Sequence, residues 1–446
     1  MPHPAQKFAA LFAARAASVW RMTDARISLA LFAAAFALYA AFALRIAQGD
    51  FLDYFNLAFD VDPRRYAQEL TRSWAAWPPD YGGPKHPLLF VFRPFAEPFL
   101  WLGFDWKEAA SLTAALFGAG AVAIAYAFLR TLQIARPDAA MLACLYALSS
   151  AQLFNAFITE SYVFSLFALA LVWRIVAARL EAPQRFRRLR YVAPILTFGI
   201  TTTNVVQAAI AEAALRFQQS PPREAIVNLI RFGIICGAIT LALLILAFPS
   251  GMWQIATHPA DALRVLLWSQ TKGDTVGLPM MFATYFGYAF VAPEFTIVEL
   301  PGGAPMLDFR QFAMGAAGWP ALALWAALLG AGCWRAAHLR DARRFLVWGL
   351  AAALAVNLIL HMRYQFRGSI FLYAPHMSFV IFALAAFAFD RMSLLLARRP
   401  FAMRAALAAL IALMAANNLP RAWELASGFD DFPFRPEWGP ALEARQ

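Results

Sequence analysis

Long apolar stretches separated by short polar ones dominate the sequence. Most reach the roughly 20 residues that a helix needs to cross a hydrocarbon layer of about 30 Å. They are residues 27–47, 87–103, 109–129, 139–158, 161–178, 191–212, 225–248, 316–334, 345–361, 369–389 and 401–419. The period-two alternation of a membrane barrel is absent, and hydrocarbon offers no partner to free backbone groups. The pattern therefore predicts an all-α polytopic membrane protein with about nine to eleven membrane helices.

Arginines gather in short loops between the apolar segments and predict the orientation of the chain. The loops richest in them are 130–136, 179–190, 335–344 and 391–404. Positively charged loops stay in the cytoplasm during insertion, so all four are expected on that side. This arrangement places the amino terminus inside and the carboxyl-terminal tail outside.

The same rule requires two apolar segments to stay on one side of the membrane. Segment 87–103 is interrupted by charges and prolines, so it is expected to dip into the membrane or lie flat on it. Segment 191–212 carries the polar run 201–204 at its middle, which favours a broken hairpin that returns to the cytoplasm. Nine full spans then remain.

The spans divide the chain into three parts. Residues 1–26 are predicted to be a cytoplasmic amphipathic segment, and 27–419 a transmembrane catalytic domain that begins with an uncleaved anchor. Three segments then lie on the outer face: the loops 48–108 and 249–315 and the tail 420–446. Residues 278–292 of the second loop are apolar and aromatic but too short to span, so we expect them to rest in the interface.

Composition excludes several protein classes. Hydrophobic residues make up 61% of the chain and charged residues 15%, against about 45–50% and about 25% in soluble proteins. A multidomain soluble protein, a disordered scaffold and a disulfide-stapled secreted domain do not fit. The net charge of +11 follows the loop arginines and does not require nucleic acid. Cys144, Cys236 and Cys333 lie in or beside apolar segments, without metal-ligand spacing.

Ionisable residues are costly at membrane depth, and here they cluster at the outer ends of the spans. Asp50 and Asp53 follow the first span, in a loop of nine acids and six bases. Glu160 occupies the tight turn between two spans. A later outer turn adds His361, Arg363, Arg367, Tyr373 and His376. The predicted topology brings these groups to one membrane face, although they are distant in sequence.

This set of residues fits sugar transfer from a lipid phosphate. Outside the cytoplasm nucleotide-activated sugars are absent, so the donor is a membrane lipid whose phosphate is already a good leaving group. One carboxylate must take the proton of the acceptor hydroxyl, and cations must hold the phosphate as negative charge develops. Arg363 and Arg367 are one helical turn apart, so both can grip phosphate oxygens if that stretch is helical.

Three short motifs stand in order along roughly the first 180 residues. They are Asp50-Phe51-Leu52-Asp53-Tyr54, Lys85-His86-Pro87-Leu88-Leu89 and Thr159-Glu160-Ser161-Tyr162. Together they resemble the GT-C superfamily of polyprenyl-phosphate-sugar-dependent glycosyltransferases. That family has an Asp-Glu-x-x-Tyr motif, a His-Pro-Pro-Leu stretch and a second acid in the next outer loop. Phe51 and Leu88 depart from this pattern.

The resemblance implies roles for individual residues. Asp50 would be the general base of an inverting transfer, Asp53 its nearby substitute, and Glu160 would orient acceptor or donor. The candidate substrate-binding residues are Tyr54, His86, Lys272, His361, Arg363, Arg367, Tyr373 and His376. The family fold has interfacial helices in the first outer loop. Some members use a divalent ion between two acids, but Phe51 replaces the second acid here, so no metal or other cofactor is expected.

We therefore expect an integral glycosyltransferase of the bacterial inner membrane with a periplasmic active site. Its partners would be a polyprenyl-phosphate-sugar donor and a lipid, glycan or protein acceptor. Two alternatives stay open: a lipid or solute transporter or flippase, for which inverted repeats are typical, and a ligase or polymerase of lipid-linked glycans. Each site residue also has an ordinary interpretation, as a solvated acid, a snorkelling arginine or a hydrogen-bonded histidine.

Overall fold

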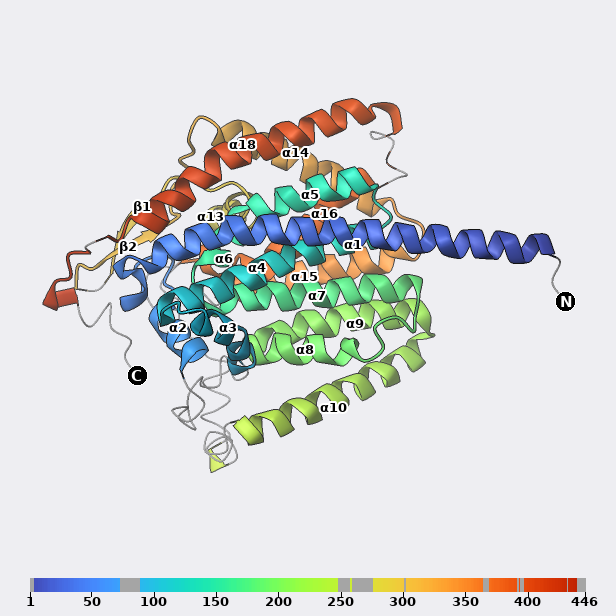
Figure 1. Cartoon of the computed structure of the whole chain (residues 1–446), viewed down its shortest axis with the longest axis horizontal. Coiled ribbons are helices and arrows are strands. Elements are labelled where there is room, and N and C mark those ends of the chain that lie inside the picture. The colour runs from blue at the N-terminus through green and yellow to red at the C-terminus, as the bar shows by residue number, and fades with distance from the viewer. Residues whose placement is uncertain are drawn as a thin grey trace.

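Almost the whole described chain is helical (Figure 1). The computed structural model describes residues 4–72, 89–247, 257–258, 276–300, 302–363, 369–390, 393, 397–430 and 432–438. The long helices lie side by side with roughly aligned axes. The one sheet in this part of the chain is the antiparallel hairpin of β1 (Thr296–Glu299) and β2 (Pro305–Asp308). The predicted all-α polytopic membrane fold is confirmed.

Seven of the described helices are long and apolar enough to cross a membrane. They are the Thr23–Ala47 part of α1 (Pro4–Ala47), α4 (Trp106–Thr131), α7 (Ser161–Glu181), α10 (Pro222–Ala247), α14 (Gly318–Ala337), α15 (Arg343–Arg363) and α18 (Pro400–Ser427). An eighth span results if α5 (Arg136–Leu148) and α6 (Ser150–Phe157), which meet at a bend of 60°, count as one. The number is below the predicted nine to eleven.

The segment 369–389, predicted to be a full span, folds as a shorter helix. Here α16 (Pro375–Ala386) continues into η7 (Phe387–Phe389), and every residue of both is buried. The helix packs against α7, α14 and α15. Because protein rather than lipid surrounds it, α16 does not need the length of a lipid-exposed span.

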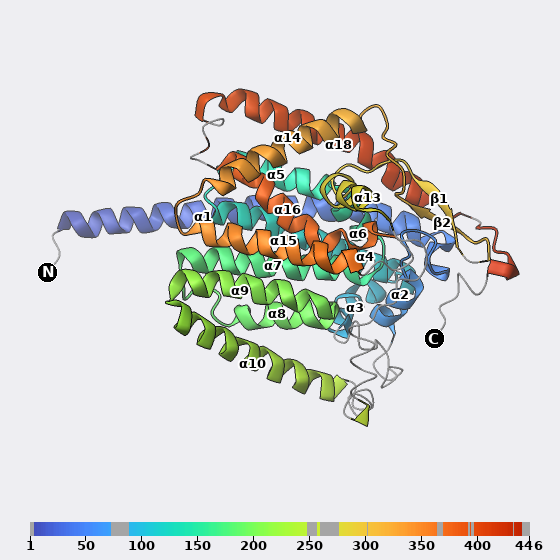
Figure 2. The ribbon, with the colours of Figure 1, turned by 180° about the vertical axis from the view of Figure 1, so that it is seen from behind.

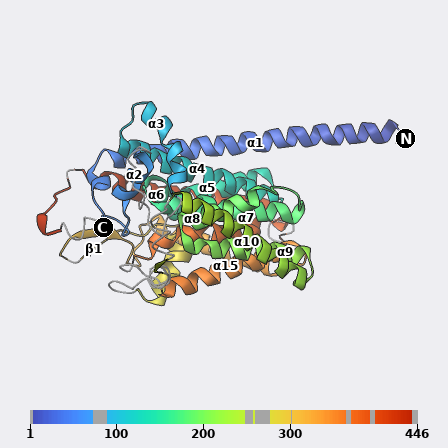
Figure 3. The ribbon, with the colours of Figure 1, turned by 90° about the horizontal axis from the view of Figure 1, so that it is seen from below.

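Two segments lie outside the predicted spans: the amphipathic segment 1–26 and the apolar, aromatic segment 278–292. The helix α1 starts at Pro4 and continues unbroken into the first span, so its amino-terminal part extends away from the bundle (Figure 3). Residues 278–292 form α13 (Leu278–Phe282) and the π-helical turn η5 (Ala283–Tyr288), followed by a turn that enters the core. There Phe290 stacks on Trp325 with ring centroids 3.8 Å apart, and both are buried. The carboxyl-terminal part of 278–292 therefore lies in the core, and the interfacial position of its exposed start stays a prediction.

Neither segment predicted to stay on one side forms a single span. In the described part of the first, η3 (Leu89–Phe95) and α3 (Glu97–Trp101) are both short. In the second, α8 (Leu189–Ile200) and α9 (Val205–Gln219) pack against each other across the turn η4 (Thr202–Asn204). The Thr201 hydroxyl lies 2.9 Å from that of Ser165 on α7, so this break in the helix has a polar partner inside the bundle. The broken hairpin is confirmed.

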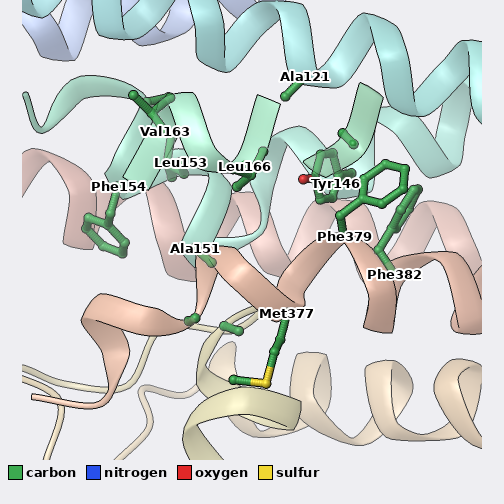
Figure 4. Close-up of a cluster of buried hydrophobic side chains, with 14 of the residues drawn as sticks. Ala121, Tyr146, Ala151, Leu153, Phe154, Val163, Leu166, Met377, Phe379 and Phe382 are labelled. Atoms are coloured by element: carbon green, nitrogen blue, oxygen red, sulfur yellow. The ribbon is translucent and has the colours of Figure 1, made fainter. Parts of the chain in front are cut away.

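Small residues let the helices approach closely. A Cβ atom on Gly118 of α4 would lie only 2.5 Å from the Cβ atom of Ala156 on α6. Larger rings fill the remaining space, and Tyr146 of α5 contacts both Phe379 and Phe382 of α16 (Figure 4). The alanine-rich composition therefore permits an interior that encloses α16 completely.

The loop arginines gather at one end of the bundle and pair there with acids. Glu212 and Arg179 have side chains only 3% exposed and lie 3.0 Å apart. Further pairs join Asp24 to Arg130 and Arg136, Asp138 to Arg404, and Asp390 to Arg335 and Arg343. The opposite end carries α2 (Pro63–Thr71), α3 and the β1–β2 hairpin (Figure 2).

We expect Glu212→Ala to destabilise the fold by about 3–5 kcal/mol, because Arg179 is left buried without its carboxylate. Chemical unfolding in detergent micelles measures the change. In the control, Glu424→Ala removes a half-exposed partner of Arg421 and should cost less than about 1 kcal/mol. Equal losses in the two variants would contradict a structural role for the buried pair.

Candidate active site

Glu160 joins the first outer loop to the turn before α7. It is the N-cap residue of that helix and is 3% exposed. Its Oε1 atom accepts the Ser161 N–H at 2.9 Å, and Oε2 accepts the backbone N–H of Asp62 at 2.8 Å. A buried carboxylate needs such donors to replace its lost hydration. The second bond therefore holds Asp62, which is 98 positions away in the chain, at the amino-terminal end of α7.

Further ionisable side chains surround Glu160. Asp62 is the N-cap residue of α2, whose first two turns carry Arg65 and Glu69. Burial and, after it, the charge of Asp62 raise the pKa of Glu160 to about 8, against two backbone N–H donors that lower it. Burial likewise raises the pKa of Glu69 to about 7, although Arg65 lowers it through an ion pair at 3.0 Å. Near neutral pH the site therefore retains protons that ordinary carboxyl groups have lost.

Three predicted substrate-binding residues, His361, Tyr373 and His376, meet in one aromatic cluster, the His–Tyr cluster. His361, near the end of α15, stacks on Tyr373 of η6 (Phe371–Tyr373) with ring centroids 4.5 Å apart. The ring of His376 on α16 lies 5.9 Å from that of His361 and 5.2 Å from that of Tyr162. Tyr162 follows Glu160 by two residues in the chain. The cluster is therefore next to the carboxyl groups, as the shared outer position predicts.

Helix ends place these rings. Pro375 lies in the first turn of α16, where the missing N–H of proline removes no helical hydrogen bond. His376 follows it, and its carbonyl oxygen accepts the Nε2 amide of Gln207 at 2.7 Å. Because Gln207 belongs to α9, the broken hairpin helps to hold the start of α16 beside the site.

Asp50, the predicted base, lies at the same end of the bundle but is bound by the tail. Its Oδ2 atom accepts the Phe432 N–H at 2.9 Å, and its own N–H donates to the Phe429 carbonyl oxygen, also at 2.9 Å. Within the described residues no hydrogen bond joins Asp50 to Glu160. The carboxylate thus has a local role in attaching the tail to the first loop.

Asp53 and Tyr54 belong to the same group as Asp50. Asp53 forms an ion pair with Lys107 at the start of α4. Tyr54 stacks on Phe434 of the tail with ring centroids 5.2 Å apart. Asp50, Asp53 and Tyr54 of the first motif therefore contact the tail and α4. The third motif contacts α2 and the His–Tyr cluster instead.

The other predicted binding residues are only partly described. Arg363 is the last residue of α15, two positions after His361. His86, Lys272 and Arg367 lie outside the described residues. Within the described ranges no three His, Cys, Asp or Glu side chains are arranged to hold a metal ion.

Sequence reasoning missed two neighbours of the site. Asp62 counted only as one of nine loop acids, although an aspartate directly before a proline is a helix-start signal. Tyr285 of η5 lies 6.1 Å from His361, between ring centroids, and comes from the second outer loop. No pattern in the sequence indicates that pairing.

Comparison with known proteins gives a distant structural likeness. No protein-family model and no curated protein matches the chain. The chain is similar to the oligosaccharyltransferase of Archaeoglobus fulgidus in its crystal structure with a tethered acceptor peptide containing the NVT sequon, with 13% sequence identity and a TM-score of 0.47. The match covers 92% of this chain and 56% of that one, so the chain spans little more than half its length.

The raised pKa of Glu160 makes the stability of the fold depend on pH. Folding favours the neutral carboxyl, so this stabilisation is fully present below the ordinary pKa of 4.5 and is lost as pH rises through about 8. We expect the unfolding temperature in micelles to fall between about pH 4.5 and about pH 8, and to fall less in Glu160→Gln, which cannot ionise. Glu69 leaves a residual slope in that variant.

The control for this measurement is Glu294→Gln, at a half-exposed acid that pairs with Arg421. It should keep the full pH dependence of the wild-type protein. An unchanged slope in Glu160→Gln would show that the carboxyl group of Glu160 does not titrate in this range.

Proposed function

We propose that the chain is a GT-C glycosyltransferase that moves a sugar from a polyprenyl-phosphate carrier to an acceptor at the outer face of a bacterial inner membrane. One observation carries the proposal: Glu160, Asp62 and the cluster of His361, Tyr373 and His376 come from remote segments and lie together. The acids supply a base, and the imidazoles and phenols supply donors for a phosphate.

The base in this proposal is the Asp62–Glu160 pair. Two interacting carboxyl groups lose their protons in two steps that belong to the pair. Once Glu160 has also lost its proton, the ionised pair accepts the proton of the acceptor hydroxyl. The acceptor oxygen then forms its bond to the anomeric carbon while the bond from that carbon to the phosphate oxygen breaks, and the lipid phosphate leaves with the electron pair. Attack opposite the leaving group inverts the configuration.

The phosphate would lie against the His–Tyr cluster. Imidazole N–H and phenol O–H groups donate to phosphate oxygens, and Arg363 follows His361 at the end of the same helix. His86, Lys272 and Arg367 remain proposed phosphate or sugar contacts from the sequence alone. Asp50, Asp53 and Tyr54 are proposed to bind substrate less directly, because their described partners are Lys107 and the tail.

The distribution of charges supports a transporter less well than a glycosyltransferase. Ionisable groups within the spans commonly mark the path of a transported ion or substrate. In the described residues, several acids at the arginine-rich end form short ion pairs, as in Arg404–Asp138 at 2.6 Å. Carboxyl groups whose pKa is raised by burial, Glu160, Glu69 and Asp308, lie at the other end. A lipid-linked glycan ligase would use the same site and would differ in the mass of its product.

Glu160→Gln and Asp62→Asn should each lower sugar transfer by about 10²–10⁴-fold, because each removes a carboxylate of the base. In the wild-type protein the rate should rise with pH through about 8, as Glu160 ionises. The assay measures transfer from defined polyprenyl-phosphate sugars by purified protein in liposomes, with product masses recorded.

Glu294→Gln is the matched control and should transfer normally, since that acid is half exposed and bound to Arg421. Asp50→Asn and Asp53→Asn test the assignment that the first motif implies. Undiminished transfer in both Glu160→Gln and Asp62→Asn would exclude the carboxyl pair as the base. Net lipid movement without a covalent product would favour a flippase.

A further inference from the structure

The strand β2 holds the acid-bearing part of the first outer loop. Leu307 of β2 donates its N–H to the Leu57 carbonyl oxygen at 2.9 Å and accepts the Phe59 N–H at 2.8 Å. Phe59 is three residues before Asp62. Because the chain cannot stretch beyond about 3.6 Å per residue, these bonds restrict where Asp62 can lie relative to β2.

Asp308, the next residue of β2, binds the segment that carries Tyr373. The side chain is buried, with the residue 1% exposed. Its Oδ1 atom accepts the Phe309 N–H at 2.8 Å and the Ser369 hydroxyl at 3.2 Å, and Oδ2 accepts the Arg310 Nε–H at 2.9 Å. Ser369 directly precedes the turn that leads into η6. One strand therefore contacts both halves of the candidate site.

Three aromatic rings reinforce this connection. Phe59 comes from the first loop, Phe309 follows β2, and Phe371 belongs to η6. Their ring centroids lie 4.9 Å apart for Phe59–Phe309, 4.6 Å for Phe59–Phe371 and 4.7 Å for Phe309–Phe371. In a closely packed interior, a shift of one segment is opposed by the rings of the other two.

We propose that Asp308 is a positioning residue that holds the Tyr373–His376 segment in place relative to the Asp62–Glu160 pair. This rests on the proposed function and adds a residue from the second outer loop, outside the three sequence motifs. Asp308 takes no part in the proton transfer. It fixes the distance between the phosphate-binding donors and the base, and a misplacement of about 1 Å can lower a rate about 100-fold.

The kinetic test compares two replacements of Asp308. Asp308→Ala should lower kcat/KM on the order of 100-fold per folded molecule, because it frees Ser369 and Phe309 from their acceptor. Asp308→Asn keeps an Oδ1 acceptor for both and should recover activity to within about tenfold of wild type. Wild-type kcat/KM in folded Asp308→Ala would overturn the proposal.

A double-mutant cycle tests whether Asp308 acts through Ser369. Ser369→Ala removes only one hydroxyl and preserves the acid. We expect it to lower kcat/KM alone but to add nothing in the Asp308→Ala background, because the shared hydrogen bond is already lost. Losses that multiply would show that the two residues act independently, and the positioning role through Ser369 would be wrong.

Hydrogen exchange tests the connection without any substrate. In Asp308→Ala, backbone amides of 57–62 and 370–376 should both exchange at least about tenfold faster than in wild type. Glu212→Ala, at the opposite end, is the control for general destabilisation and should leave both segments unchanged relative to the rest of the fold. If wild type transfers no sugar but exchange follows this pattern, the proposed function fails and the connection remains. Unchanged exchange in both segments overturns the connection.

Discussion

The bond from the Asp62 backbone N–H to the Glu160 carboxyl group is the interaction on which the candidate site depends. Glu160 is buried at the start of α7, in a place that helix packing leaves poor in water. Its carboxyl group needs donors, and one of them comes from the first outer loop. Satisfying one buried acid thereby brings a second acid beside it.

Charges serve different purposes at the two ends of the bundle. At the arginine-rich end, acids such as Glu212 and Asp390 each form ion pairs with two arginines. At the other end Asp62 and Glu160 are like-charged neighbours, and burial raises the pKa of Glu160. Carboxyl groups held near neutral pKa by burial and a like charge are typical of catalytic sites rather than of structural ion pairs.

Hydrogen bonds and ring contacts hold the two long loops where they meet the candidate site. Loops that carry functional groups usually rely on a scaffold beneath them. Here β2 supplies part of that scaffold through Leu307, Asp308 and the rings around Phe309. The tail adds a second attachment at Asp50, so the first loop is held at both its start and its middle.

Several features could be predicted from the sequence. They are the membrane fold, the two segments that do not form single spans, and the meeting of His361, Tyr373 and His376 with the turn at Glu160. Apolar length and arginine position are local properties to which lipid and the insertion machinery respond directly. Span ends on one face are then neighbours by topology.

Which loop acid reaches Glu160 was decided only by the tertiary structure: Asp62 does so, and Asp50 binds the tail instead. That choice follows from hydrogen bonds between residues 98 and 382 positions apart, and no local pattern encodes such pairings. The burial of α16 and of Phe290 has the same origin, because an apolar segment can be surrounded by protein as well as by lipid.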